Sequence, residues 1–239
     1  MKTIKLHRYN NGEIIFEAVC SNTKECIEMA LSKGYNLHHI DLSNKSLKDI
    51  CLDDARIIHG KFRGSDLRGA NMSEGCFRGC DFSNALLHSA CLNESDFSDA
   101  AFINTRFGDT DCAGTNFSNA LFSGLTTFYM RLHESYSLDH AHYIHDDGRA
   151  YKMTQAPVVL SGLGQPVVLL DHHILNEGKI RTHSKVLHDL RETHMNINAG
   201  NKLHQKNLRF QKPANALDHL TLALAYETGR IKTGISSRR

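Results

Sequence analysis

Side chains that could bind a metal ion gather in one short segment of the 239-residue chain. Four of them follow closely on one another: His140, His142, His145 and Asp146. Imidazole and carboxylate groups are common zinc ligands, and on an extended strand His140 and His142 would share one face. No cysteine or further spaced ligand pair completes the set, so a solvated strand end and hairpin tip is the competing interpretation. We expect no metal, no cofactor and no catalytic residue, and keep a small metal-dependent hydrolase activity as an alternative.

A second group of candidate residues is acidic and lies in the middle of the chain. Asp54, Glu74 and Glu94 recur every twenty residues. Like charges stacked along a sheet repel one another, so a retained acidic ladder favours a surface for a basic partner. The competing interpretation is that charged outer positions only keep the protein soluble and protect its edges. The candidate partner-binding residues are Asp54, Glu74, Glu94, Asp96, Asp99, Asp109 and Asp111.

The acidic residues belong to a stretch, residues 36–126, in which an apolar side chain recurs at every fifth position. The series starts at Leu37, runs through eighteen successive apolar positions and fails at Thr127. A second column, two residues before each of these, is mostly small. A period of five fits neither a helix face nor a flat strand. It predicts a chain that turns a corner every five residues, with one large and one small side chain pointing inward.

The large residues also vary with a longer period. Taken in sets of four, they form columns of which two are rich in phenylalanine, so like side chains recur every twenty residues. This predicts coils of four pentapeptides, about 4.5 coils in all, stacked roughly 4.8 Å apart. The interior is then filled and leaves no room for a ligand. The predicted core ladder contains Phe62, Phe77, Phe82, Phe97, Phe102, Phe107, Phe117 and Phe122.

Short segments within these repeats carry a family signature. The triplets are Ser65-Asp66-Leu67, Ala70-Asn71-Met72, Cys80-Asp81-Phe82, Ser95-Asp96-Phe97 and Thr115-Asn116-Phe117. They closely resemble the pentapeptide-repeat family, whose repeats run approximately A(D/N)LXX. The resemblance implies a right-handed quadrilateral β-helix. Some members of that family are thought to inhibit or protect DNA gyrase by mimicking duplex DNA, which makes a gyrase-directed DNA mimic an alternative function here.

Two flanking segments complete the predicted organisation into residues 1–35, 36–126 and 127–239. In the first, Asn11-Gly12 predicts a hairpin turn and residues 23–33 predict a helix, which together would cap the first coil. The repeats before Ala55 are looser, so we expect a first coil that is distorted or merges with the cap. The fold class is therefore mainly β: a β-helix with an N-terminal hairpin and helix cap and a small C-terminal α+β domain.

The C-terminal third has no repeat and no recognised catalytic signature. Its pattern predicts a hairpin over residues 143–153 and strands over 157–160, 166–170 and 172–180, the last bounded by Gly178. Helices are predicted over 184–194 and 214–229. Basic residues are frequent between 179 and 212, but few aromatic residues accompany them. Direct nucleic-acid binding is therefore not expected.

Composition sets the remaining expectations. The chain has no apolar run of membrane-spanning length, and its seven cysteines form no CxxC pair, which favours a cytoplasmic protein without a membrane anchor. Residues 36–126 contain eight basic and twelve acidic residues, a modest excess for a DNA mimic. We predict a non-enzymatic protein that uses its β-helix faces and its C-terminal domain to bind and modulate a protein partner. A phage or mobile-element protein that acts on a host factor would fit this description. DNA gyrase is one candidate partner, and monomer and homodimer both remain open.

Overall fold

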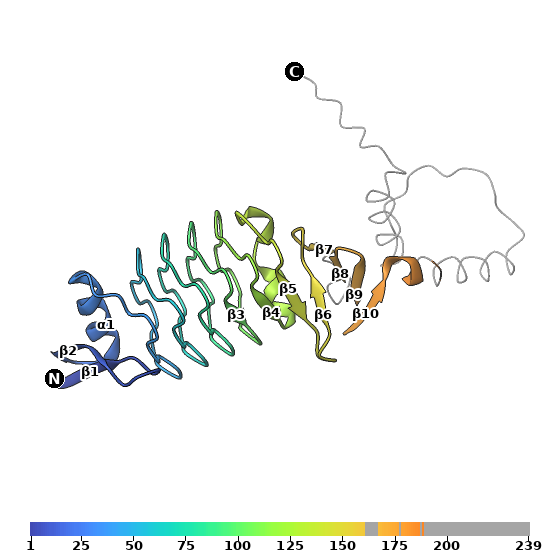
Figure 1. Cartoon of the computed structure of the whole chain (residues 1–239). Helices are drawn as coiled ribbons and strands as arrows, with labels where there is room; N and C mark the ends of the chain where they lie inside the picture. The colour runs from blue at the N-terminus through green and yellow to red at the C-terminus, as the bar shows by residue number, and fades with distance from the viewer. Residues whose placement is uncertain (161–166, 177, 187, 189–239) are drawn as a thin grey trace, which may run out of the picture. The chain divides into compact units, whose positions relative to one another are not determined.

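The computed structural model describes residues 1–160, 167–176, 178–186 and 188. The chain divides into two compact units, Met1–Pro157 and Val158–Arg239 (Figure 1), and each is described by itself. The first unit contains the hairpin, the helix and the repeats. The second contains a small antiparallel sheet.

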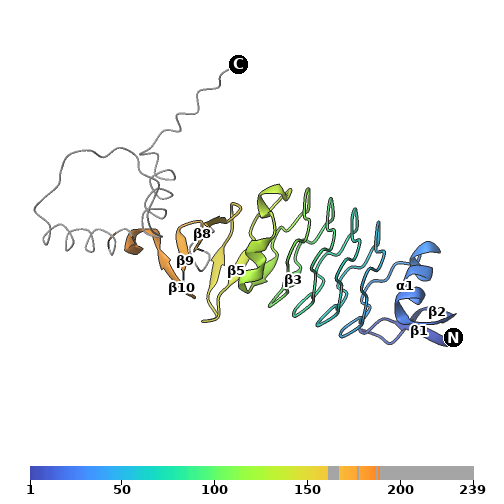
Figure 2. The ribbon, with the colours of Figure 1, turned by 180° about the vertical axis from the view of Figure 1, so that it is seen from behind.

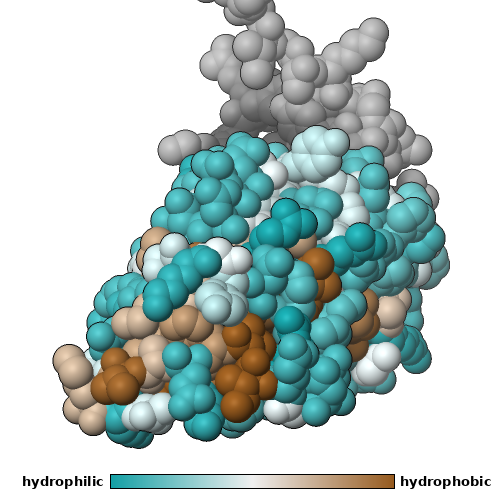
Figure 3. Space-filling model, turned by 60° about the vertical axis from the view of Figure 1, so that its left-hand side comes forward, coloured by the Kyte–Doolittle hydropathy of each residue, from teal (hydrophilic) through white to brown (hydrophobic). Residues whose placement is uncertain are grey.

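The N-terminal segment forms the predicted hairpin and helix. Strands β1 (Lys2–His7) and β2 (Ile14–Cys20) pair antiparallel, and helix α1 (Thr23–Ser32) follows. Asn22 is the N-cap, because its side chain accepts a hydrogen bond from the backbone N–H of Glu25 at 2.9 Å. Apolar residues gather on this end of the molecule (Figure 3), where β2 exposes Ile14 and Val19.

The cap is joined to the first coil by hydrogen bonds to the backbone carbonyls of that coil. The Tyr9 N–H donates to the carbonyl of His39 at 2.8 Å, and Lys24 Nζ donates to the carbonyl of Asp49 at 2.7 Å. The expected distortion of this coil is wrong, since Asp41 and Lys61 form a regular parallel bridge. The alternative, a coil that merges with the cap, agrees with the antiparallel bridge between Arg8 and Ile40. The cap supplies partners that an open solenoid end would lack.

Parallel bridges stack the repeats at a spacing of twenty residues (Figures 1 and 2). Three successive coils contribute four of them each, and the first set consists of Asp41↔Lys61, Ser46↔Asp66, Cys51↔Asn71 and Arg56↔Cys76. The same register continues to the pair Asp96↔Asn116. The predicted coil of four pentapeptides is therefore confirmed.

Most pentapeptides turn their corners in the same way, and the corner at Asp109 is an exception because Asp109 is not at a positive φ. In the turn from Leu52 to Ala55, the Ala55 N–H donates to the Leu52 carbonyl at 3.1 Å, and Asp54 has φ 55°. A positive φ at the third residue is typical of a type II turn, a position that favours glycine or asparagine. The large residue before the turn and the small residue after it both point inward.

The phenylalanines of the predicted core ladder fill this interior, and all eight are at most 1% exposed. In one column Phe62, Phe82 and Phe102 stack with centroid separations of 4.7 and 5.3 Å. In the next, Phe77 and Phe97 stack at 5.0 Å. Stacked rings of this kind stabilise the fold beyond the burial of their surface.

The stacking continues past residue 126, where the sequence analysis ended the repeats. Strand β3 (Ala101–Phe102) pairs with β4 (Leu121–Ser123), which pairs in parallel with β5 (His142–Ile144). Leu121 lies opposite His142, one residue further on than in the regular coils. Two short 3₁₀ helices, η1 (Leu125–Tyr129) and η2 (Leu132–Glu134), lie in this last turn. The turn is 21 residues long instead of 20, so its inward residues fall outside a strict five-residue series.

The predicted hairpins of the C-terminal third are present. Strand β6 (Ala150–Lys152) pairs antiparallel with β5. In the second unit, β7 (Val158–Leu160), β8 (Val167–Leu170), β9 (His173–Asn176) and β10 (Lys179–Thr182) form one antiparallel sheet in the order β10-β9-β8-β7.

The boundary expected at Gly178 is confirmed, since Gly178 has a positive φ of 68° and lies between β9 and β10. The expected end at residue 180 is wrong, because the residues after Gly178 form the separate strand β10. Residues 183–186 begin the helix expected over 184–194. The rest of that helix, and the one expected over 214–229, lie outside the described residues.

Candidate functional site

The twenty-residue coil sorts the outward turn residues onto four corners, each of which collects one residue from every coil. The acidic corner carries Asp54, Glu74, Glu94 and Gly114. The histidine corner carries His39, His59, Gly79, Asp99 and Asn119. The other two carry Asn44, Gly64, Asn84, Asn104 and Gly124, and Asp49, Gly69, Ser89 and Asp109. Four surfaces of different chemistry therefore run along the same stack.

The acidic corner keeps glutamate where the backbone disfavours it. Glu74 and Glu94 have φ values of 55° and 58°, in the left-handed region that glycine and asparagine occupy most readily. Along the part of the chain that the structure describes, the side chains of Asp54, Glu74 and Glu94 make no ion pair or hydrogen bond, and all three residues are exposed. The corner ends at Gly114, where a Cβ would collide with the Glu94 carboxylate.

Two other predicted acids lie on different corners. Asp99 belongs to the histidine corner, where it is paired with Arg78 Nε at 3.1 Å. Asp109 accepts a hydrogen bond from the Ser89 hydroxyl at 2.8 Å, which holds the pKa of that carboxyl below its ordinary value. The predicted set of seven acids is therefore divided among several surfaces.

The last two predicted acids lie on flat sides of the coil rather than at corners. Asp96 accepts hydrogen bonds from the Ser98 N–H at 2.9 Å and from Asn116 Nδ2 at 3.1 Å. Asp111 accepts from Asn93 Nδ2 at 3.0 Å, and this bond is the main reason that its pKa is lowered. Both carboxylates hold neighbouring coils together.

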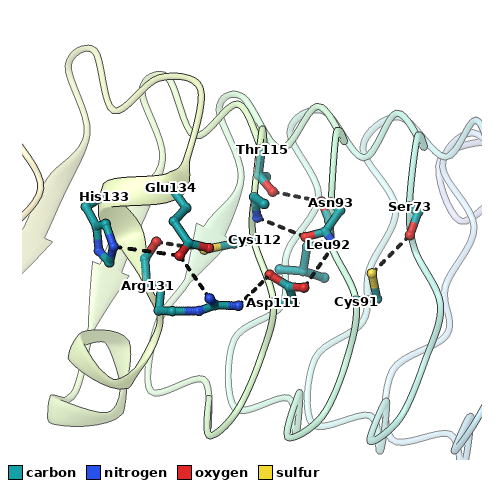
Figure 4. A network of polar contacts seen from close by, with 11 residues as sticks. Ser73, Cys91, Leu92, Asn93, Asp111, Cys112, Thr115, Arg131, His133 and Glu134 are labelled. Carbon is teal, nitrogen blue, oxygen red and sulfur yellow. Dashed lines mark hydrogen bonds and ion pairs between the residues drawn. The ribbon is translucent and has the colours of Figure 1, made fainter. Parts of the chain in front are cut away.

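Asp111 also belongs to a polar network that ties η2 to the regular coils (Figure 4). Arg131 Nη2 lies 3.3 Å from Asp111, and its Nη1 donates to Glu134 Oε1 at 2.9 Å. His133 Nε2 lies 3.7 Å from the same Glu134 oxygen. The guanidinium offsets the charge of Asp111, which removes this residue from the acidic surface.

Beside this network lie two exposed aromatic residues that the sequence analysis did not single out. Tyr129 and Tyr136 are 57% and 81% exposed. Tyrosine and arginine are enriched among residues that carry binding energy at interfaces. The signal that could have located them is the break of the five-residue period at Thr127.

The candidate metal-binding residues do not form one site. His140 lies in a turn with φ 58°, before β5 begins at His142, so the two histidines do not share a strand as expected. His145 Nδ1 lies 3.2 Å from Asp147, while Asp146 is exposed. Within the described ranges, no group of three or more His, Cys, Asp or Glu side chains could hold a metal ion.

The buried cysteines are not placed for chemistry. Burial raises the pKa of the Cys112 thiol to about 12 and that of Cys26 to about 11. A thiol is nucleophilic only as the thiolate, so these side chains are unreactive near neutral pH. Among the helices that can be described, none has the length and apolar character that a membrane crossing requires.

Comparison with known proteins locates the similarity in the coils. The family model for pentapeptide repeats matches residues 50–88 and 95–125, in eight copies. None of the curated proteins matches the chain. A pentapeptide repeat protein from Nostoc is 22% identical, with a TM-score of 0.35, and the match covers 44% of this chain and 89% of that one.

Two further solved structures show similar partial matches. One from the thylakoid lumen of Arabidopsis thaliana is 24% identical, with a TM-score of 0.27, and the match covers 46% of this chain and 83% of that one. Full-length QnrB1, a plasmid-mediated fluoroquinolone resistance protein, is 15% identical, with a TM-score of 0.19 and coverages of 42% and 66%.

Proposed function

The repeat block of this chain belongs to the pentapeptide-repeat family, and on that premise we propose that the protein is a non-enzymatic binding protein that holds a basic protein partner on its acidic corner. The proposed architecture is the right-handed quadrilateral β-helix of the family, with the hairpin and α1 as its cap.

The filled interior supports an external binding surface. Phe62, Phe82 and Phe102 are fully buried and in stacking contact, so a ligand inside the coils would have to displace them. Removing such a ring costs roughly 3–5 kcal/mol. Recognition by the side chains that point outward needs no such rearrangement.

The observation that carries the proposal is the left-handed conformation of Glu74 and Glu94. Residues held in disfavoured backbone regions cluster at binding and catalytic sites. Asparagine would adopt this turn with less strain, as it does at Asn84 and Asn104. Two glutamates in line with Asp54 instead give an uncompensated row of carboxylates, which suits lysine and arginine side chains of a partner.

A capture experiment with corner variants tests the proposal. The immobilised full chain is incubated with a bacterial lysate, and bound proteins are quantified by mass spectrometry. Replacing both glutamates (Glu74→Asn with Glu94→Asn) keeps a residue suited to the turn and removes two charges. We expect the retained basic proteins to be lost from this variant.

Asp99→Asn is the matched control, since Asp99 is an acid on another corner and is already paired with Arg78. It should retain the same proteins as the unmodified chain. Equal retention by the double variant, or equal loss from the control, would contradict a partner-binding role for the acidic corner.

A DNA gyrase partner is the narrower form of this proposal. Charge mimicry of DNA would need a continuous negative surface. The neighbouring surfaces do not provide one, because Arg78 pairs with Asp99 and Arg131 pairs with Asp111. The acidic corner alone is then the part that could enter a DNA-binding groove. In a supercoiling assay, gyrase should be inhibited by the unmodified chain and not by the double variant, and an unchanged rate with both excludes gyrase.

A further inference from the structure

Positively charged side chains gather on the first two coils, around His39 and His59 of the histidine corner. Asp99 and Asp111, the acids paired with arginines, lie on later coils. The cationic patch consists of Arg8, His38, His39, Arg56, His59 and Lys61. Five of its members come from the first two stacked coils, and Arg8 comes from the cap. Folding therefore assembles a group that the sequence does not show as a cluster.

Ring contacts hold the patch in place along the corner. The rings of His39 and His59 stack with centroids 5.4 Å apart, and Tyr9 meets His39 edge-on at 5.8 Å. The Tyr9 hydroxyl donates to the His59 carbonyl at 2.8 Å. Lys61 Nζ lies over the Tyr9 ring, 3.8 Å from its centroid. The cationic groups are thus held at fixed positions before any ligand arrives.

Two carboxylates lie beside the patch: Glu13, next to Arg8, and Asp41, which forms a parallel bridge with Lys61. Arg8 pairs with Glu13 at 3.1 Å, but Arg56 and Lys61 make no ion pair with any residue that the structure describes. Burial and then Arg8, His39, Arg56 and His59 lower the pKa of His38. Each of these four neighbours disfavours a further positive charge on His38.

The extent of the patch limits what it can bind. It spans the cap and two coils, a length of roughly 10 Å at the spacing of stacked strands. On the following coils, Asp81 and Asp99 pair with Arg63 and Arg78 at 3.3 and 3.1 Å, which ends the positive surface. A duplex backbone would need cations along several successive phosphates. A short acidic segment needs only a few.

We propose that the cationic patch is a second docking surface, distinct from the acidic corner, and that it binds a short Asp- and Glu-rich segment of a protein partner. Arg56 and Lys61 flank His59 and supply the charges, and the imidazoles donate hydrogen bonds to carboxylates. The Tyr9 and His39 rings form the floor on which the segment lies.

Fluorescence anisotropy of a labelled oligoglutamate peptide, titrated with the full chain at low salt, tests this surface. We expect binding by the unmodified chain and a weakening of about fivefold in the Arg56→Gln, Lys61→Gln double variant, since each exposed charge pair contributes modestly. The matched control is Lys48→Gln with Arg106→Gln, which removes two charges elsewhere on the coils. Thermal unfolding of each variant verifies folding, and Arg56→Gln alone replaces the double variant if that is unstable.

Three outcomes overturn the proposal: equal weakening by the control pair, tighter binding of an oligothymidylate of the same charge, or self-association of the chain that the double variant abolishes. The last would assign the patch to a second copy of the protein. The acidic-corner variant Glu74→Asn, Glu94→Asn should bind oligoglutamate at least as well as the unmodified chain, so failure of one surface is distinguishable from failure of the other.

Discussion

The inward and outward positions of the stacked coils differ in how much the side chain changes from one coil to the next. Inward columns repeat nearly the same side chain, as in Phe62, Phe82, Phe102 and Phe122. Outward columns change within two coils, from His59 through Gly79 to Asp99. The inner positions are coupled because each ring packs on the rings above and below. The outer ones share only a backbone turn, so their chemistry is free to vary for binding.

The largest effect should come from breaking an inner column. Phe82→Ala removes a ring that stacks on Phe62 at 4.7 Å and on Phe102 at 5.3 Å. We expect a loss of roughly 3–5 kcal/mol in the free energy of unfolding, from lost burial and the cavity that remains. Urea unfolding measures it, with the exposed Tyr136→Ala as control. A loss no larger than that of the control would contradict the packed-column interpretation.

Overfilling the small inner column should have the next largest effect. A Cβ added at Gly75 would collide with the Phe77 ring and lie 3.2 Å from the Ala55 carbonyl. Gly75→Ala should therefore cost about 1–3 kcal/mol in unfolding free energy. At Gly108 the obstructing atoms belong to the half-buried His88 side chain and include no backbone atom, so Gly108→Ala should cost less. The reverse order in thermal melts would show that the small column is loosely packed.

A buried hydroxyl tests the same column more gently. Thr105 Oγ1 donates to the Phe82 carbonyl at 2.7 Å, and the residue is 1% exposed. Thr105→Val keeps the shape and removes the donor, and the Phe82 carbonyl still accepts from the Ala85 N–H. We expect a loss of about 1 kcal/mol, measured by urea unfolding. An unchanged midpoint would mean that the hydroxyl only fills space.

Acid should weaken the attachment of the cap through His38. Burial, together with the nearby Arg8 and other cations, lowers the pKa of His38 below its ordinary value of 6.5. The unfolded chain then binds the proton more readily, so this stabilisation is complete above pH 6.5 and is lost as the pH falls through the lowered pKa. Thermal melts from neutral to mildly acidic pH should show a declining midpoint. The decline should be shallower in His38→Gln, and an identical slope would assign it to other groups.

Changing an outer charge should have the smallest effect on stability. Glu74 lies between Asp54 and Glu94 in the acidic corner, so Glu74→Gln relieves repulsion and should change the unfolding free energy by less than about 0.5 kcal/mol, in the stabilising direction. A clear destabilisation in urea unfolding would show that this carboxylate has a structural partner. A stability gain together with lost partner capture would separate function from folding at one residue.

Most of the inner architecture is predictable from the sequence because packing repeats. The series from Leu37 to Phe122 gives the coil of four pentapeptides, and Asn11-Gly12 and Asn22 mark the cap. The last turn of the stack was not predictable, since one extra residue places Leu138 and Tyr143 inward but outside the series. A register shift is invisible to a search for a fixed period.

The surfaces were less predictable, for a different reason. The series Asp54, Glu74 and Glu94 follows from the period, but the partners of Asp99 and Asp111 depend on side-chain reach between coils and on η2. The cationic patch combines Arg8 with Lys61, which are far apart in sequence. Local sequence patterns identify which residues point outward, but they do not identify which of these side chains contact one another.

The twenty-residue bridge register also limits how this protein can change in length. A duplication of four pentapeptides would add one coil and keep every later residue on its own corner. A duplication of one pentapeptide would preserve the hydrophobic pattern but turn everything after it by one side, so that a later acid such as Glu94 would leave its line with Glu74. Viable length variants should therefore gain or lose whole coils.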